Sequence, residues 1–329
     1  MIIPVKLKKK EDRSYKIIVE DGLIDRIPSL LNYGVRYAVI ADSKVGKLYG
    51  QKLVKRLGKK AKLFTFPHGE RSKNLFTVEA LCKKMLKENF DRHDCIIALG
   101  GGVTGDIAGF VSSIYMRGIP YVQVPTSLLA MVDSSVGGKT GVDMEEGKNL
   151  LGTFLQPKAV YIDPLLLKTL PKKHFVNGMA EVVKYGCIKS KSLFRYISKN
   201  YEKILTLEPK PLNKIIVQSC KIKRDIVEKD EHEKLGLRMC LNFGHTIGHA
   251  IEKLTDYTIL HGEAVAIGMV QMCRDKRLTE LLKKIGLPTK IPKGIKKSHI
   301  LEVIKKDKKK KGKKIMHVLV KKIGKAILK

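Results

Sequence analysis

The chain has 329 residues, of which 43% are hydrophobic, and its formal net charge at pH 7 is +33. This length and content suffice for a full core and predict two domains, while the lack of a signal-peptide pattern and of an apolar run of roughly 20 residues predicts a cytoplasmic protein outside the membrane. The lysines are spread along the chain without a nucleic-acid-binding motif, so we expect a phosphorylated small molecule as partner and no specific nucleic-acid binding.

The first half of the chain alternates predicted strands with predicted helices. Residues 2–20 alternate in hydrophobicity, which predicts an antiparallel pair or edge strands. Strands are then predicted at 37–42, 61–66, 95–102 and 121–125, with helices at 44–58 and 75–89. This βαβ spacing predicts a parallel sheet covered by helices on both faces, with ligands bound at the carboxyl ends of the strands.

A glycine run, GGGVTGD at 100–106, follows the predicted strand at 95–102. Glycines let a backbone approach a pyrophosphate closely, and the N-terminus of a following helix offers free N–H groups to anions. The run does not match the GxGxxG dinucleotide fingerprint after a first strand, and a simple turn is the alternative. Two small-residue loops are predicted after it, and they carry Lys139 and Lys148 as candidate phosphate ligands.

The pattern changes after the apolar segment at 159–163. Helices are predicted in succession at 174–189, at 212–230 and around the histidines of NFGHTIGHAIEKLTDYTILHGEAVAIG, residues 242–268. This places a domain boundary near residue 163. The tail contains a run of lysines, for which a solvated loop is predicted, and it ends in a short predicted strand.

Three of the nine histidines lie in that last window, and they suggest a metal site. His245 and His249 are four residues apart, so a helix places both imidazoles on one face, and His261 opens the next helix. Imidazoles suit zinc or a similar ion, and a catalytic site needs about three protein ligands. The alternative is that these histidines are polar residues packed beside small ones. The pattern is not the HExxH of a metalloprotease.

Nine sequence blocks in consistent order resemble the 3-dehydroquinate synthase family of sugar-phosphate cyclases. They are HGERSK, ALGGGVTGDIAGF, MRGIP, VPTSLLAMVDSSVGGKTGVD, GKNLLGTF, GMAEVVKYG, LNFGHTIGHA, LHGEAVAIGM and a late DKK. The resemblance implies an α/β fold in which a Rossmann-like NAD-binding domain with a parallel sheet, residues 1–163, precedes a mainly α-helical domain for metal and substrate, residues 164–329.

The resemblance also implies the residues of the site. It makes Glu181, His245 and His261 the ligands of one zinc or cobalt ion, which replaces the three-histidine set, and it makes His249 a substrate contact. Catalytic roles fall on Lys139, Lys184, His249 and Asn149. Substrate contacts fall on Asp133, Arg117, Lys223, Arg238, Asn242 and Lys308. The segment before Arg238 is one residue longer than is usual in the family, which leaves Lys221 as the alternative to Lys223, and Lys309 is the alternative to Lys308.

The NAD contacts implied by the resemblance gather around the predicted strand ends. They are Asp42, Glu70, Lys73, Gly101, Gly102, Val103, Thr104, Gly105, Asp106, Thr126, Ser127, Lys139, Lys148 and Thr169. An acidic residue at a strand end can hold ribose hydroxyls, so Asp42 favours NAD over NADP. The family usually has two threonines where this chain has Thr126 and Ser127, and both hydroxyls are kept.

The implied reaction converts 3-deoxy-D-arabino-heptulosonate 7-phosphate to 3-dehydroquinate and phosphate in the shikimate pathway. It passes through transient oxidation by NAD, phosphate elimination, reduction and an aldol cyclisation. The alternatives are another cyclase such as 2-deoxy-scyllo-inosose synthase, a polyol or glycerol-1-phosphate dehydrogenase, and a basic RNA-binding protein. The resemblance further implies a homodimer in which Arg117 reaches the phosphate site of the neighbouring subunit; a helix-capping arginine is the alternative.

Overall fold

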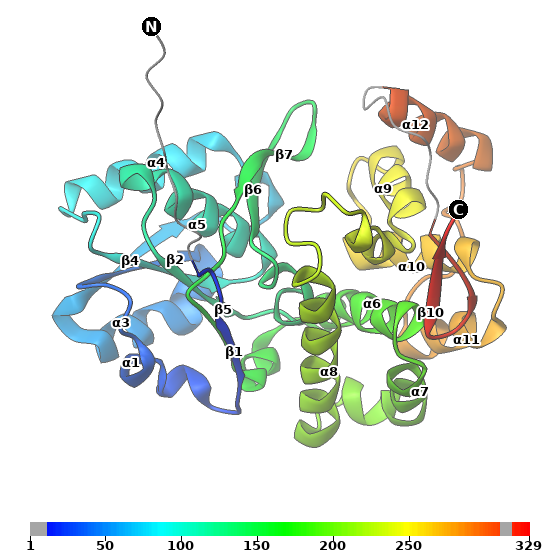
Figure 1. Ribbon diagram of the computed structural model, residues 1–329, viewed down its shortest axis with the longest axis horizontal. Coiled ribbons are helices and arrows are strands. Elements are labelled where there is room, and N and C mark those ends of the chain that lie inside the picture. The colour runs from blue at the N-terminus through cyan, green and yellow to red at the C-terminus, as the bar shows by residue number, and fades with distance from the viewer. Residues whose placement is uncertain (1–11, 310–317) are drawn as a thin grey trace, which may run out of the picture.

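A computed structural model describes residues 12–309 and 318–329 of the chain, and it has two halves of different architecture (Figure 1). A six-stranded sheet forms the first half, in the order β1-β8-β5-β4-β2-β3, and every pairing in it is parallel. Its strands are β1 (Lys16–Val19), β2 (Tyr37–Asp42), β3 (Ala61–Phe66), β4 (Cys95–Gly100), β5 (Tyr121–Pro125) and β8 (Ala159–Ile162). The predicted parallel sheet is therefore confirmed.

The apolar runs explain why these segments form the sheet interior. Every residue of β2 and β4 is buried, as expected for parallel strands covered on both faces. β1 lies at the sheet edge and pairs in parallel with β8. The edge-strand prediction therefore holds for residues 16–19, while the antiparallel alternative would involve residues 2–7, which lie outside the described part of the chain.

Helices connect these strands at the predicted places, and a short helix that was not predicted, α1 (Ile27–Leu30), lies between β1 and β2. The others are α2 (Ser43–Val45), α3 (Gln51–Leu57), α4 (Leu75–Lys87) and α5 (Gly102–Ile114). The single helix predicted at 44–58 is interrupted by a π-helical turn at Gly46–Gly50. Both glycines of this turn pack against β3, where an added Cβ would lie 2.8 Å from Thr65 or Leu63. The close contact with the strand accounts for the small residues in the helix.

The two small-residue loops predicted around Lys139 and Lys148 are instead an antiparallel hairpin, β6 (Lys139–Met144) and β7 (Gly147–Phe154). Its glycines serve strand pairing, because Gly141 faces Gly152 and a Cβ on Gly152 would lie 2.0 Å from the carbonyl oxygen of Thr140. The loop prediction is therefore wrong. Glycine content suggested loops, whereas the pairing of two backbones at close range requires the same residues.

Helices dominate after β8, as the sequence predicted (Figure 1). They are α6 (Lys172–Ile188), α7 (Lys191–Leu205), α8 (Pro209–Val227), α9 (His245–Leu254), α10 (His261–Met272), α11 (Lys276–Ile285) and α12 (Lys297–Lys309), followed by the antiparallel pair β9 (Val318–Lys322) and β10 (Lys325–Leu328). None of the described helices is long and apolar enough to cross a bilayer.

One hydrophobic core joins the two halves. Val122 of β5 and Val160 of β8 belong to the same buried cluster as Val183 and Tyr185 of α6. A continuous set of buried apolar side chains therefore runs from the strands to α6, the helix that carries Glu181.

Candidate active site

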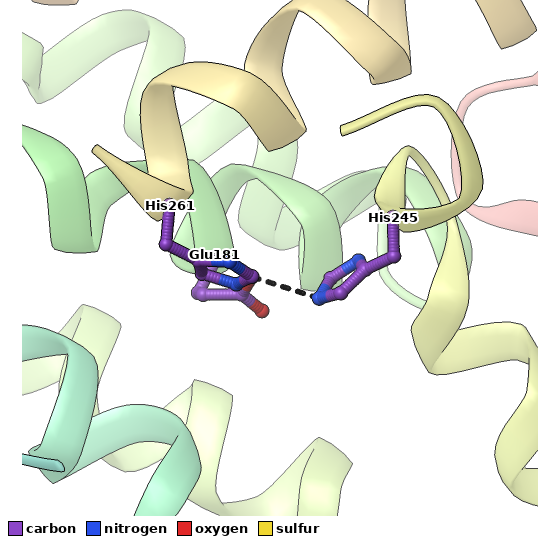
Figure 2. Close-up of side chains that lie close together, drawn as sticks. All are labelled: Glu181, His245 and His261. Atoms are coloured by element: carbon purple, nitrogen blue, oxygen red, sulfur yellow. Dashed lines mark ion pairs between the residues drawn. The ribbon is translucent and has the colours of Figure 1, made fainter. Parts of the chain in front are cut away.

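Three helices supply one carboxylate and two imidazoles to a single cluster, which we call the metal cluster: Glu181, His245 and His261. Glu181 lies in α6, His245 is the first residue of α9, and His261 is the first residue of α10. The side chains converge in Figure 2, where Glu181 Oε1 lies 3.5 Å from His245 Nε2 and 3.7 Å from His261 Nε2.

Local packing explains why the histidines occupy these positions. The amide oxygen of Asn177 accepts a hydrogen bond from the backbone N–H of Gly262 at 2.6 Å, which attaches the start of α10 to α6 one turn before Glu181. A Cβ on Gly262 would lie 2.0 Å from the carbonyl oxygen of Asn177, so only glycine permits this contact. The first turn of α10 is thus fixed against the helix that carries the carboxylate.

Small residues also bring α9 and α10 together. A Cβ on Gly268 would lie 2.0 Å from the carbonyl oxygen of Gly244, and a Cβ on Gly248 would lie 3.1 Å from the backbone of Ala264. Gly244 itself has φ 82°, a left-handed conformation suited to glycine, and it immediately precedes α9. This close approach leaves the ring centroids of His245 and His261 5.2 Å apart.

The metal cluster has the properties of a site for a divalent transition metal. Glu181 is fully buried, and neither of its carboxylate oxygens has a hydrogen bond, although Lys184 Nζ lies at ion-pair distance from Oε2. Burial raises the pKa of Glu181, but the charge of Lys184 leads the effects that outweigh it and lower the pKa to about 2. Burial lowers the pKa of His245 well below its usual value, so its ring is neutral and free to ligate. One carboxylate and two imidazoles with an open position suit zinc or cobalt.

His249 lies beside the metal cluster and outside it. Its ring centroid is 5.4 Å from that of His245 and 5.8 Å from that of His261. Its side chain is 59% exposed, and Nε2 lies 4.0 Å from Glu252 Oε2. Of the described residues, His249 joins His261 and Glu252 in a second group of closely spaced donors, and it does not join the group that contains Glu181.

A buried ion pair lies next to the metal cluster. Lys223 Nζ in α8 lies 2.8 Å from Asp133 Oδ1, and the hydroxyl of Tyr185 donates to the same oxygen at 2.5 Å. Burial raises the pKa of Asp133, but Lys223 and Lys184 outweigh it and hold the pKa well below its usual range. Lys221 is exposed, so of the two lysines left open by the sequence it is Lys223 that faces Asp133.

Lys139 and Arg238 share a carboxylate that the sequence did not point to. Glu233 Oε1 lies 2.6 Å from Lys139 Nζ and 3.3 Å from Arg238 Nε. The guanidinium is also held by the carbonyl oxygen of Glu231, to which Arg238 donates at 2.8 Å. Glu233 lies in the segment before Arg238, and the extra residue of that segment relative to the usual family spacing was the available sign that its contacts could differ.

The carboxyl ends of the strands gather most of the predicted NAD contacts. Asp42 ends β2 and caps α2, and Gly101 follows β4 and caps α5. A Cβ on Gly101 would lie 3.4 Å from Ser127 Oγ, so the glycine run passes close to the hydroxyl that follows β5. Thr169 ends the 3₁₀ segment after β8, and its hydroxyl is 2.6 Å from that of Tyr49. The start of α5 thus presents free N–H groups at the sheet edge, an arrangement suited to a pyrophosphate.

The hairpin and the glycine run are linked by Lys73. Its Nζ lies 2.6 Å from Asp106 Oδ2 in α5 and also donates to the side-chain oxygen of Asn149 in β7. Asn149 has φ 55°, a left-handed conformation in which its N–H reaches Asp143 Oδ1 at 2.8 Å. Beside it, Lys148 Nζ lies 3.5 Å from Glu70 Oε1 and 4.4 Å from the ring centroid of Tyr257.

Three predicted residues are not brought into these contacts. Arg117 is exposed at the far end of α5 from the glycine run, with φ 68°, and the 13 residues of the helix measure about 20 Å at 1.5 Å per residue. Asn242 is exposed at the end of a 3₁₀ segment before α9. Lys308 falls in α12, but its side chain, like that of Lys309, lies outside the described part of the chain.

Four residues in these contacts were not predicted from the sequence: Asn177, Tyr185, Glu233 and Glu252. Glu252 is buried and touches both His249 and His261. The available signal was spacing, because Glu252 follows His249 by three positions and so lies on the same face of α9. A carboxylate in that register is usually a solvated helix residue, and only the packing of α10 onto α9 encloses it.

Solved structures of sugar-phosphate cyclases share this fold. The 2-epi-5-epi-valiolone synthase of Streptomyces hygroscopicus subsp. jinggangensis, solved with NAD+ and Zn2+ bound, matches with a TM-score of 0.89 and 27% identity over 99% of this chain and 95% of its own. A 2-deoxy-scyllo-inosose synthase with carbaglucose-6-phosphate, NAD+ and Co2+ matches with a TM-score of 0.86 and 28% identity over 95% and 91%. A probable glycerol dehydrogenase of Sinorhizobium meliloti, at 20% identity, shares the fold alone. The class is that of sugar-phosphate cyclases.

Sequence comparison narrows the class to one family. The N-terminal model of 3-dehydroquinate synthase matches residues 63–177, and the C-terminal model matches residues 178–310. The 3-dehydroquinate synthase of Thermodesulfovibrio yellowstonii is 45% identical over 95% of this chain and 92% of its own length, and that of Thermoanaerobacter pseudethanolicus is 46% identical over 96% and 94%. The chain belongs to the 3-dehydroquinate synthase family.

Proposed function

We propose that this protein is a 3-dehydroquinate synthase, a lyase that converts 3-deoxy-D-arabino-heptulosonate 7-phosphate to 3-dehydroquinate and phosphate with bound NAD and one zinc or cobalt ion. The observation that carries the choice of substrate is the pair of buried cations Lys223 and Arg238, which are 5% and 3% exposed. The heptulosonate has a carboxylate for them to bind, whereas glucose 6-phosphate, the substrate of 2-deoxy-scyllo-inosose synthase, has none. Relatives of the same name at 42% to 46% identity support the proposal.

Different residues of the site would bind the metal and the substrate, orient the substrate and move protons. Glu181, His245 and His261 would hold the metal, which acts when bound as a Lewis acid toward the substrate hydroxyls. Residues at the strand ends would hold NAD, which would supply reversible hydride transfer without net redox change.

The phosphate and carboxylate of the substrate would lie against separate groups of side chains. Lys139 and Asn149 hold the phosphate, with Lys308 assigned there by the family resemblance, and Lys223 and Arg238 hold the carboxylate. His249, exposed next to the metal cluster, is placed to assist proton movement, while Lys184 and Asp133 orient the hydroxyls. These side chains mainly position the substrate and stabilise its charges, and the family resemblance implies the same roles.

We assign NAD to a domain of residues 1–163 and the metal and substrate to a domain of residues 164–329. The change from sheet to helices after β8 supports this division, and so do the strand-end position of Asp42 and the helical origin of the metal cluster. We also place the enzyme in the cytoplasm, because its proposed substrate is a phosphorylated metabolite and its six cysteines are free thiols.

One assay tests the function. Purified protein loaded with zinc or cobalt and a catalytic amount of NAD is given the heptulosonate phosphate, and released phosphate and NADH are measured together. We expect phosphate and 3-dehydroquinate in equal amounts without accumulation of NADH. Accumulation of NADH with an intact phosphate would indicate a dehydrogenase, and turnover of glucose 6-phosphate alone would indicate a different cyclase.

We further propose a homodimer in which Arg117 acts at the active site of the partner subunit. Its exposed position beyond the end of α5 opposite the glycine run supports this, because it places the guanidinium on the surface, where a partner subunit can reach it. A two-fold interface makes such an exchange reciprocal, and a guanidinium offers a planar fork for phosphate.

Complementation tests this arrangement. Arg117→Ala and Lys184→Ala should each be inactive, and mixing them under conditions of subunit exchange should restore activity. Half of the mixed dimers are heterodimers with one intact site of two, so we expect about a quarter of the wild-type activity. An exchanged mixture that stays inactive, or an active wild-type monomer by light scattering, would exclude Arg117 as a residue acting across the interface.

A further inference from the structure

A buried carboxylate lies behind one of the two histidines of the metal cluster. Glu252, in α9, is 4% exposed, and its Oε1 lies 3.5 Å from His261 Nδ1. Its other oxygen, Oε2, lies 4.0 Å from His249 Nε2. Burial of a carboxylate is costly unless a partner offsets it, so the two imidazoles account for its presence there.

The two ring nitrogens of His261 face two different carboxylates. Nε2 lies 3.7 Å from Glu181 Oε1, inside the metal cluster, and Nδ1 lies 3.5 Å from Glu252 Oε1, outside it. A neutral imidazole has one N–H and one lone pair, and a metal takes the lone pair. A proton held on Nδ1 by Glu252 therefore leaves the lone pair of Nε2 pointing toward Glu181 and His245.

The other histidine of the cluster is oriented in the same sense by a different group. His245 Nδ1 lies 3.3 Å from the backbone carbonyl oxygen of Phe243, and its Nε2 lies 3.5 Å from Glu181 Oε1. Each imidazole thus has an oxygen acceptor at Nδ1 and the metal cluster at Nε2. For His245 the acceptor is backbone, which a side-chain substitution does not remove, whereas for His261 it is the side chain of Glu252.

We propose that Glu252 is a positioning residue for the metal site: it holds the Nδ1–H of His261 so that Nε2 is the ligating nitrogen. The inference rests on the proposed function, since it takes the metal cluster as the place of the ion. Carboxylates behind metal-bound histidines fix the ring orientation and raise the basicity of the ligand, and their loss weakens metal affinity by about 10- to 100-fold. The same contacts could instead belong to a second ion held by His249, Glu252 and His261, and the test separates the two.

The test uses zinc affinity of the full-length protein, measured by competition with a chromophoric chelator, without reference to turnover. Glu252→Leu keeps the volume and removes the acceptor, and we expect its zinc dissociation constant to rise by about 10- to 100-fold. Glu252→Gln keeps an oxygen that can accept from Nδ1–H, so its dissociation constant should lie between those of the wild type and Glu252→Leu. The d–d absorption of the cobalt-loaded protein should shift in the same order, which a purely structural role would not produce.

Glu263→Gln is the matched control. Glu263 lies two residues after His261 and accepts a hydrogen bond from the backbone N–H of Leu260 at 2.9 Å, so it caps the same helix end. We expect its zinc affinity to stay within about twofold of the wild type, because orientation of the ring by Glu252 is intact. An equal loss in Glu263→Gln and Glu252→Gln would show a general charge effect and overturn the proposal.

The remaining outcomes are also decisive. A folded Glu252→Leu protein with wild-type zinc affinity would overturn the positioning role, while leaving the metal cluster and the proposed function intact. Two equivalents of zinc in the wild type and one in Glu252→Gln would replace the positioning role by a second ion. A wild-type protein that binds no divalent metal would instead contradict the proposed function itself.

Discussion

The metal cluster and the lysine–carboxylate pairs of this protein differ in how far their charged groups are already paired within the chain. In the metal cluster, Oε2 of the fully buried Glu181 is paired with Lys184, but Oε1 has no hydrogen bond within the described residues and the ring of His245 is neutral, so Oε1 and that imidazole remain available to a cation. The cationic side chains are already neutralised by carboxylates of the same chain, in the pairs Lys73–Asp106, Lys139–Glu233 and Lys223–Asp133.

This difference has consequences for binding. A cation entering the metal cluster gains interactions with Glu181 Oε1 and the imidazoles, while Glu181 Oε2 keeps its ion pair with Lys184. An anion reaching Lys139 must compete with Glu233, and one reaching Lys223 must share that ammonium with Asp133. The carboxylate partners offset the free-energy cost of leaving these lysines unpaired where they are partly buried. Because a ligand must compete with those carboxylates, the site favours a ligand with strong anionic groups, such as a phosphate or a carboxylate.

The largest effect is expected from the metal cluster. Glu181→Ala removes the carboxylate from the three proposed ligands, and we expect loss of bound metal and a fall in kcat of about 10³-fold or more, since Lewis-acid assistance contributes several kcal/mol. Metal content by mass spectrometry and phosphate release measure both. Glu280→Ala, an exposed glutamate of α11, is the control and should keep both. Full metal occupancy in Glu181→Ala would show that the cluster is not the metal site, and the contrast with the lysine–carboxylate pairs would then fail.

A smaller effect is expected at an exposed lysine–carboxylate pair. The Lys139 side chain is 54% exposed, so its pair with Glu233 should add little to folding, within about 0.5 kcal/mol. Its proposed role as a phosphate ligand predicts that Lys139→Met loses turnover by about 10²-fold or more while bound NAD stays measurable.

Two measurements compare these roles: urea unfolding for stability, and phosphate release with NAD retention for function. Lys199→Met, an exposed lysine of α7, is the matched control and should behave as the wild type in both. Unchanged kinetics in Lys139→Met would show that Lys139 is a surface lysine.

The smallest effect concerns the buried pair. Tyr185→Phe removes a hydroxyl that donates to Asp133 Oδ1, and hydrogen bonds to charged groups contribute about 1.5 kcal/mol or somewhat more, so the free energy of unfolding at pH 7 should fall by about that amount. The folded pKa of Asp133 is depressed below 3.8, so this contribution is present above pH 3.8 and is lost as the pH falls below it. Melting temperatures of wild type and variant should therefore converge in acid. A constant difference across that range would place the effect of Tyr185 in packing.

Much of the fold follows from the sequence because its strands are short apolar runs bounded by turns. β2, β3 and β5 have the predicted bounds, and the change from alternating strands to helices lies after β8, as expected. A strand buried on both faces has a local signature that does not depend on its neighbours. The hairpin β6–β7 was missed because glycines that face each other across two strands resemble glycines in a loop.

In the candidate site, too, local sequence patterns predicted some features and tertiary packing decided the others. The sequence by itself determined the histidines and their order along the chain, since spacing within one helix is local information: His249 follows His245 by one turn. That spacing suggested three histidine ligands, and Glu181 was added by the family resemblance. Tertiary structure alone decided which groups meet across helices. Glycine contacts bring α10 onto α6 and α9, and this packing places Glu252 against His261 Nδ1. Separately, the loop before Arg238 meets the start of β6, which places Glu233 between Lys139 and Arg238. Contacts between segments distant in the sequence depend on how whole helices pack, and no local pattern of residues encodes that geometry.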